Sequence, residues 1–349
     1  MKGKIVFALS FIAALTGAAF AQKPTPTPKT NKVVVITGGI NGLPRVQNSP
    51  QQFAPPDLPT ILQRADEQTE NYQEEFKNLL GDETKTFETF DKNGKSKKQT
   101  TVESNFIVYQ SSKNEALATE YRNVIKVNGK TVGGSEKRAT DLFTQIAKSA
   151  SPQSELEEIQ KESSRYDKNL DISGLTLFQA PILAEYARPF FDFTLLPNET
   201  IDGKDAFVLQ YRQTKPSPYV LLNDNKTSGE KLSLTFEEDL PGSIGEPNAR
   251  LRGKMWIDAQ TFQIRREERE LTIQPANLQT PLVIQKTEFE YQPSDLGILV
   301  PKRIVLNSYT VKAKDKGANI SAIQDTKATF QYNKFTKSDV QVNSGEVKN

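Results

Sequence analysis

The stretch Leu251-Arg-Gly-Lys-Met-Trp-Ile-Asp-Ala-Gln-Thr-Phe-Gln-Ile-Arg-Arg-Glu-Glu-Arg-Glu-Leu-Thr-Ile273 decides the fold class of this chain. Its first half alternates, so that one face carries Leu251, Gly253, Met255 and Ile257 and the other carries Arg252, Lys254 and Trp256. A period of two is the period of a β-strand. A turn follows at 258–261, and the returning strand contains the charged run 265–270, which we interpret as a solvated face of weak cross-strand ion pairs. The stretch therefore predicts an antiparallel hairpin.

Segments of the same kind continue on both sides of this hairpin. The expected strands span 84–90, 98–109, 121–127, 190–195, 206–213, 231–237, 250–258, 262–273, 282–292, 298–309 and 322–332. Asn93-Gly94 and Asn128-Gly129 are dipeptides that favour tight hairpin turns. Because short turns join antiparallel neighbours, the sequence predicts a long antiparallel meander of about eleven strands.

Helical patterns occur in two places. Apolar residues recur at helical spacing after Asp57, and Gly81 supplies a stop, so we expect a leading amphipathic helix that ends there. A helical block is expected over 135–187, with starts at Ser135 and Ser151 and a third short helix over 181–187. The combination of these helices with the meander predicts an α+β fold.

The N-terminus has the pattern of an export signal. Two lysines precede a short apolar run, and Ala19 and Ala21 are the small residues expected before a cleavage site, so we expect residues 1–21 to be removed. The Pro- and Gly-rich segment 22–56 is predicted to be a disordered tether. A single domain is expected over 57–336, followed by a disordered tail over 337–349. Export to the periplasm or to the extracellular space follows from the signal.

Composition excludes several classes of function. The formal net charge is +2 and the predicted leader contains two lysines, so the remaining chain lacks the basic excess of a nucleic-acid binder. The chain contains no Cys and no His, which excludes Ser-His-Asp and Cys-His catalysis and imidazole or thiolate zinc sites. No phosphate-binding or dinucleotide motif is present. We therefore expect no catalytic, cofactor or metal-binding residues, no cofactor and no integral membrane span.

Two segments resemble the periplasmic lipoprotein-carrier superfamily, which includes the lipoprotein chaperone, its outer-membrane receptor and an envelope-stress regulator. They are the strand, Asp turn and charged strand of Gly253–Glu268, and the Gly-Ile-Leu-Val-Pro bend within Tyr291–Leu306. The resemblance implies a curved, unclosed barrel of about eleven strands with helices covering one face. The chain is also similar to uncharacterised secreted proteins of soil bacteria, through Thr119–Lys130 and Arg165-Tyr166, and that likeness implies no activity.

These observations predict a non-enzymatic envelope protein that binds lipid or the acyl chain of a lipoprotein between the curved sheet and the helices. The candidate cavity residues are Phe178, Phe190, Phe191, Phe193, Met255, Ile257, Phe289 and Tyr291. The alternative is that these aromatic residues are plain core, and the sequence by itself favours that alternative. A protein-interaction or structural module of the envelope, with another envelope protein as partner, remains open. A carboxylate-based hydrolase using 237–239 or Glu267 and Glu268 is disfavoured, because adjacent residues on a strand face opposite ways.

Overall fold

The computed structural model describes residues 56–77, 79–111, 113–167, 175–222, 234–236, 240–241, 249–276, 278–314 and 319–337. The predicted leader, almost all of the predicted tether, the tail beyond residue 337 and the carboxylates at 237–239 lie outside these ranges. Every helix and strand given below lies in one compact unit.

The described elements follow one another in the order helix, strands, helices, strands. They are α1 (Leu58–Phe76), β1 (Leu79–Phe90), β2 (Ser96–Ser111), β3 (Asn114–Val127), β4 (Lys130–Thr131), α2 (Ser135–Ile146), α3 (Pro152–Ser163), the 3₁₀ turns η1 (Pro181–Leu183) and η2 (Arg188–Phe190), β5 (Phe191–Ile201), β6 (Lys204–Gln213), β7 (Val220–Leu222), β8 (Leu234–Phe236), β9 (Ala249–Asp258), β10 (Ile264–Ile273), β11 (Leu282–Pro293), β12 (Leu299–Lys314) and β13 (Asn319–Lys337).

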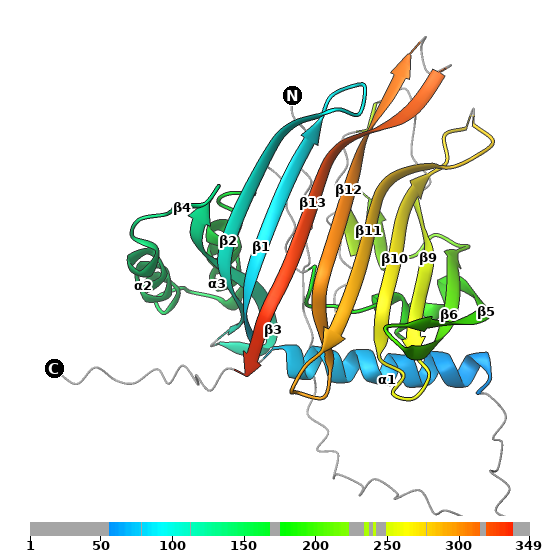
Figure 1. Ribbon diagram of the computed structural model, residues 1–349, viewed down its shortest axis with the longest axis horizontal. Coiled ribbons are helices and arrows are strands. Elements are labelled where there is room, and N and C mark those ends of the chain that lie inside the picture. The colour runs from blue at the N-terminus through cyan, green and yellow to red at the C-terminus, as the bar shows by residue number, and fades with distance from the viewer. Residues whose placement is uncertain are drawn as a thin grey trace, which may run out of the picture. The chain divides into compact units, whose positions relative to one another are not determined.

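Eleven of the described strands form one antiparallel sheet in the order β4-β3-β2-β1-β13-β12-β11-β10-β9-β6-β5 (Figure 1). The two outer strands, β4 and β5, are not paired with each other, so the sheet is curved but unclosed. This confirms the predicted α+β class and the predicted unclosed sheet. The strands at the two ends of the described chain, β1 and β13, pair in the interior of the sheet over Leu79 to Thr89 and Thr326 to Lys337.

The strand count agrees with the prediction, but the membership differs. The segment expected over 231–237 contributes β8, which pairs in parallel with β7 in a separate two-stranded sheet. The short strand β4 completes the main sheet instead, after the turn at Asn128 and Gly129, whose positive φ angles of 51° and 74° suit a tight hairpin. Because β6 pairs directly with β9, the strands β7 and β8 of the small sheet form part of the connection between them.

The boundary between the leading helix and the first strand was predicted wrongly. The helix ends at Phe76, and Leu79, Leu80 and Gly81 already belong to β1. Gly81 acts within the strand, since a Cβ there would lie 2.9 Å from the ring of Phe335. The glycine therefore makes room for an aromatic ring on the sheet and does not end a helix.

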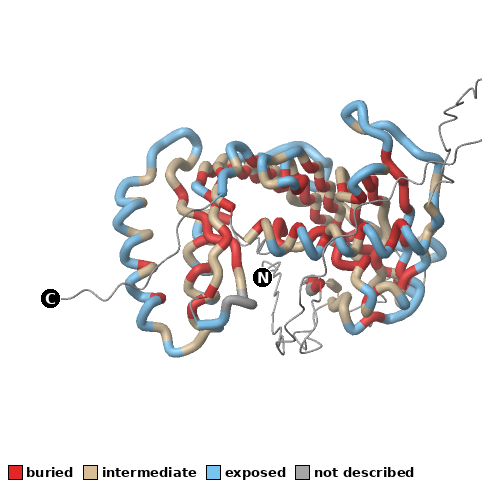
Figure 2. Tube along the Cα trace, turned by 90° about the horizontal axis from the view of Figure 1, so that it is seen from below, coloured by how far each residue is buried: buried red, intermediate tan, exposed pale blue. Residues whose placement is uncertain are grey.

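Helix α1 crosses one face of the sheet near the ends of its strands (Figures 1 and 2). Arg64 lies 3.8 Å above the ring of Phe262, beside β10, and Tyr72 meets the edge of Tyr291 on β11 at 6.3 Å. At the far end Phe76 lies 6.1 Å from Phe106 on β2. The aromatic positions predicted from the helical spacing therefore anchor α1 across most of the sheet.

The predicted helical block divides into two parts. Helices α2 and α3 pack on Tyr121, which belongs to the opposite face of the sheet from its neighbours Glu120 and Arg122, and the block therefore does not lie wholly on the α1 side. The helix expected over 181–187 is absent, because only the 3₁₀ turn η1 and a further turn form there. Within the described ranges, none of the helices is both long and apolar enough to cross a bilayer.

Candidate functional site

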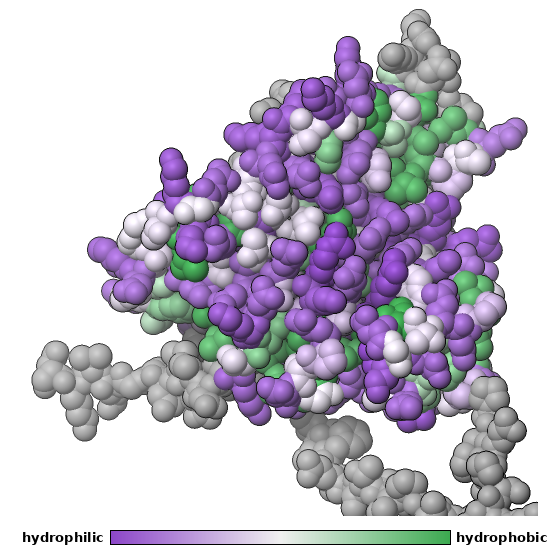
Figure 3. Space-filling model, in the orientation of Figure 1, coloured by the Kyte–Doolittle hydropathy of each residue, from purple (hydrophilic) through white to green (hydrophobic). Residues whose placement is uncertain are grey.

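The face of the sheet beneath α1, which we call the inner face, carries a nearly continuous apolar layer. One row across it follows the cross-strand register through Leu209, Met255, Glu267, Phe289, Ile304, Phe330 and Lys85. All seven side chains are at most 1% exposed. The opposite face is mostly hydrophilic (Figure 3). The apolar side of the sheet is thus removed from water, as one-sided burial of an antiparallel sheet requires.

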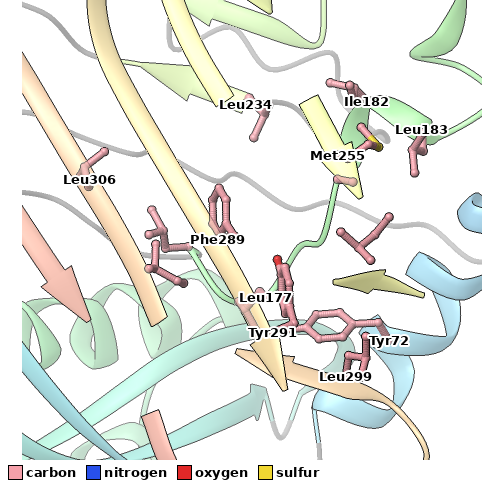
Figure 4. Close-up of a cluster of buried hydrophobic side chains, with 14 of the residues drawn as sticks. Tyr72, Leu177, Ile182, Leu183, Leu234, Met255, Phe289, Tyr291, Leu299 and Leu306 are labelled. Carbon is pink, nitrogen blue, oxygen red and sulfur yellow. The ribbon is translucent and has the colours of Figure 1, made fainter. Parts of the chain in front are cut away.

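Residues 175–190, which we call the cover segment, pack on this layer. Leu177, Ile182 and Leu183 belong to the same hydrophobic cluster as Met255 and Phe289, with Leu177 beside Tyr291 and with Ile182 and Leu183 near Met255 (Figure 4). The cover segment contains two 3₁₀ turns and no strand or α-helix. Apart from the 2.9 Å hydrogen bond that Thr214 N donates to the Phe190 carbonyl at its end, it therefore lies on the sheet without sharing the sheet's ladder of backbone hydrogen bonds.

Polar side chains fasten the cover segment at both of its ends. Thr176 donates from its backbone nitrogen and its hydroxyl to Glu120 Oε1, at 2.7 and 2.6 Å. The Thr176 carbonyl accepts a 2.6 Å hydrogen bond from the Tyr72 hydroxyl of α1. At the other end, Arg188 Nη2 lies 3.0 Å from Asp66 Oδ2, also on α1. These few contacts hold the cover segment between α1 and the sheet.

The structure places all eight predicted cavity residues in one cluster. Phe191, Met255, Ile257, Phe289 and Tyr291 are buried in it, and Phe178, Phe190 and Phe193 are partly buried against it. They come from the cover segment and from β5, β9 and β11, which the sequence alone could not bring together. Their role in enclosing a ligand stays a prediction.

The charged run 265–270 is not a wholly solvated face, and that prediction was wrong for two residues. Glu267 is fully buried and Arg269 is 7% exposed, whereas the residues between and around them face the hydrophilic side. Arg269 donates to Glu267 at 2.9 and 3.0 Å and lies 5.0 Å over the ring of Phe289. Burial and the Glu267 carboxylate raise the pKa of the adjoining Tyr211 phenol far above its ordinary value, so that phenol stays protonated. Strand alternation was the signal that could have revealed the pair.

A second buried polar cluster, which the sequence analysis did not identify, occupies the β1–β3 end of the inner face. Arg122 lies 2.8 Å from both Glu83 and Glu120, and Lys85 pairs with Asp167. Burial alone would lower the pKa of Arg122, but the two carboxylates raise it well above its usual value. Burial raises the pKa of Asp167 although Lys85 opposes the shift. The two clusters flank the apolar layer with charges that are already paired.

Several buried polar atoms on the inner face have no hydrogen-bond partner, and two of them lie side by side. These two are Gln285 Nε2 on β11 and Ser308 Oγ on β12, which are 2% and 3% exposed as residues. Gln285 and Ser308 are direct cross-strand partners. Their side chains follow the alternation of Phe289 and Ile304, so they point toward the apolar layer.

The disfavoured hydrolase gains nothing from this arrangement. Glu267 faces inward against Arg269, while Glu268 faces the other side and pairs with Arg266 at 2.5 Å, so the two carboxylates do not oppose each other. Among the described residues, no group of three or more acidic side chains is arranged to hold a metal ion.

Comparison with known proteins gives structural neighbours only. No family model matches the sequence, and no curated protein matches it. Similar folds occur in a DUF1329 family protein from Desulfovibrio piger (11% identity, TM-score 0.30, covering 81% of this chain and 94% of that one), a LolA superfamily protein from Nitrosomonas europaea (10%, 0.27, 81% and 94%) and an outer-membrane lipoprotein-sorting protein domain from Vibrio parahaemolyticus (10%, 0.31, 82% and 94%). The second description names the LolA superfamily, and the third names outer-membrane lipoprotein sorting. At these TM-scores the fold assignment rests on the strand pairing itself.

Proposed function

We propose that this protein is an exported, non-enzymatic envelope protein that holds an acyl chain, of a lipid or of an acylated lipoprotein, between the inner face of the sheet and the cover segment. The observation that carries the proposal is the buried apolar layer of an unclosed sheet. It is covered by the cover segment, which is not a strand of that sheet. Burial of apolar surface contributes ~25 cal/mol per Å², so one acyl chain would add several kcal/mol on entry.

The way in which the cover segment is fastened supports this function. Segments with few backbone hydrogen bonds open at lower free energy than the sheet beneath them. Outward movement of Leu177, Ile182 and Leu183 would leave the apolar layer exposed, and an acyl chain could replace their contacts. The sheet itself would not need to change its pairing.

Uptake of a pyrene-labelled fatty acid by the purified mature protein tests the proposal. We expect saturable uptake of one chain per protein, and lipid extracted from the purified protein. Failure to take up the probe, together with the absence of extractable lipid, would contradict it.

The site of uptake can be tested because the chain contains no cysteine. Leu183→Cys places a thiol in the cover segment, and Val208→Cys places one in a separate cluster on the opposite face; both native side chains are 0% exposed. Addition of the fatty acid should change the rate of thiol labelling at position 183 and leave the rate at position 208 unchanged. Equal changes at both positions would indicate general loosening of the fold and would argue against a bound chain at the inner face.

One observation favours the second candidate, a protein-interaction module. Among the described strands, β5 is an outer strand of the main sheet, and Leu195 on it is 40% exposed. An exposed strand edge can accept a strand from a partner protein. Capture of an envelope protein by the lipid-free chain, lost on Leu195→Lys, would favour this function.

A further inference from the structure

Gln285 and Ser308 are direct cross-strand partners on the inner face, and each has a buried polar atom without a hydrogen-bond partner. As cross-strand partners the two residues have Cβ atoms ~4.5–5.5 Å apart. Gln285 Nε2 and Ser308 Oγ nevertheless make no hydrogen bond to each other or to any other group. A buried donor that lacks an acceptor destabilises the folded protein. Two such donors side by side therefore favour a missing acceptor between them.

The surroundings define the chemistry of that acceptor. Two buried apolar residues flank the pair. Leu271 is the cross-strand partner of Gln285 on β10, and Leu306 lies two residues before Ser308 on β12. Among the described inner-face residues of β10, β11 and β12, the cation is Arg269, and Glu267 neutralises it at 2.9 Å. A carboxylate would therefore be buried here without a free countercharge, at high cost. An uncharged carbonyl oxygen, which accepts two hydrogen bonds, matches the two donors.

We propose that Gln285 and Ser308 form a binding site for the uncharged carbonyl oxygen of an ester- or amide-linked acyl chain. This inference rests on the proposed function and adds to it the chemical class of the ligand: a molecule whose acyl group is ester- or amide-linked, which should bind in preference to a free fatty acid. The acyl chain would extend from the pair along β11 and β12 toward Phe289 and Ile304.

Binding measurements with two matched probes test the site. The probes are the methyl ester of a pyrene-labelled hexadecanoic acid and the pyrene-labelled hexadecane that lacks the carbonyl. With the full mature chain, Gln285→Leu and Ser308→Ala should each weaken binding of the ester about five- to tenfold, the effect expected for one hydrogen bond. Neither variant should weaken binding of the alkane. Because each variant removes an unpartnered polar group, each should melt at or above the wild-type temperature.

Gln324→Leu serves as the matched control. It makes the same chemical change on β13, where Gln324 donates to Asn307 on the other face of the sheet at 2.8 Å. Ester binding should be unchanged in this variant. If ester binding is also unchanged in Gln285→Leu and Ser308→Ala, the inference is overturned while the proposed function stands. If the wild-type chain takes up neither probe, both proposals fail together.

Discussion

Arg122 of β3 reaches across β2 to pair with Glu83 of β1. The guanidinium Nε lies 2.8 Å from Glu83 Oε1, and its carbon lies 5.3 Å over the ring of Phe106, the cross-strand neighbour of Arg122 on the intervening strand. The side chains of Arg122 and Glu83 are at most 2% exposed. Three strands are therefore tied together on the inner face by a single buried cation.

Removal of that cation should be costly. Arg122→Met leaves Glu83 and Glu120 buried without their countercharge, and the loss of a partner from a buried ion pair destabilises by about 3–5 kcal/mol. Urea unfolding followed by circular dichroism measures the change. Lys126→Met is the control, because Lys126 and Glu103 are 43% and 34% exposed and their pair should contribute less than about 1 kcal/mol. Similar losses in the two variants would contradict this account.

Gly253 should not tolerate a side chain. An added Cβ would lie 1.9 Å from the Glu268 carbonyl oxygen and 2.6 Å from the Tyr211 hydroxyl, which crosses the strand at this position. Relief of that overlap requires a backbone shift, so Gly253→Ala should cost at least about 3 kcal/mol of unfolding free energy in the same urea assay. Gly133→Ala, with no atom within 4 Å of the new Cβ, should stay within about 0.5 kcal/mol of wild type. A Gly253→Ala variant as stable as the wild type would contradict this steric account.

Tyr72→Phe should loosen the cover segment. Burial raises the pKa of Tyr72 well above its ordinary value, so the phenol remains a donor to the Thr176 carbonyl throughout the stable pH range. Loss of this hydrogen bond should cost about 1 kcal/mol and increase the labelling rate of a thiol at Leu183→Cys about fivefold. The thiol at Val208→Cys should react at its original rate. Unchanged labelling at position 183 would mean that other contacts hold the cover segment.

Asp66 should make stability depend on pH. Burial raises its pKa from 3.8 to about 6, although Arg188 opposes the shift. The folded state therefore holds the proton more tightly than the unfolded state, and its contribution to stability decreases as pH rises from about 4 to about 6. Across this range the unfolding free energy of the wild type should therefore fall relative to that of Asp66→Asn as pH rises. The variant should have the flatter pH profile. Other acids such as Asp167 titrate in both proteins and cancel in the difference, so a constant difference would refute the assignment.

The N-terminal prediction can be tested directly. When the full chain is expressed in a bacterium with its own leader, mass spectrometry of the exported protein should find Gln22 as the first residue. Ala21→Phe should block processing, because signal peptidase requires a small residue before the cut. A mature protein that retains Met1 would contradict the export assignment.

Much of the local structure could be predicted because it depends on residues near one another in the chain. The alternation from Leu251 to Ile257 predicted which side chains of β9 are buried together, and the register confirms it with Met255 opposite Leu209. The turn at Asn93-Gly94 forms as expected, with Asp91 accepting from two backbone nitrogens at 2.8 and 3.0 Å. Local signals failed at Gly81, because glycine ends helices and also admits rings onto strands.

The candidate site was harder to predict than the strands. Phe289 and Met255 were identified as apolar positions, but the Gln285–Ser308 pair, on strands joined by a hairpin, was invisible until the register was known. The inward placement of Glu267 and Arg269 likewise follows from a register that turns every second side chain of a strand to one face.

Outside the helix end near Gly81 and the turns at 181–187, the sequence by itself determined most of where the chain is extended or helical, and that it has no thiol or imidazole chemistry, since these depend on composition and near neighbours. Tertiary structure alone decided that β1 lies beside β13 and that residues 175–190 cover the inner face. The physical reason is that any one strand could pair with many nearly equivalent partners. The pairing between distant segments is selected by the total burial and hydrogen bonding of the folded sheet.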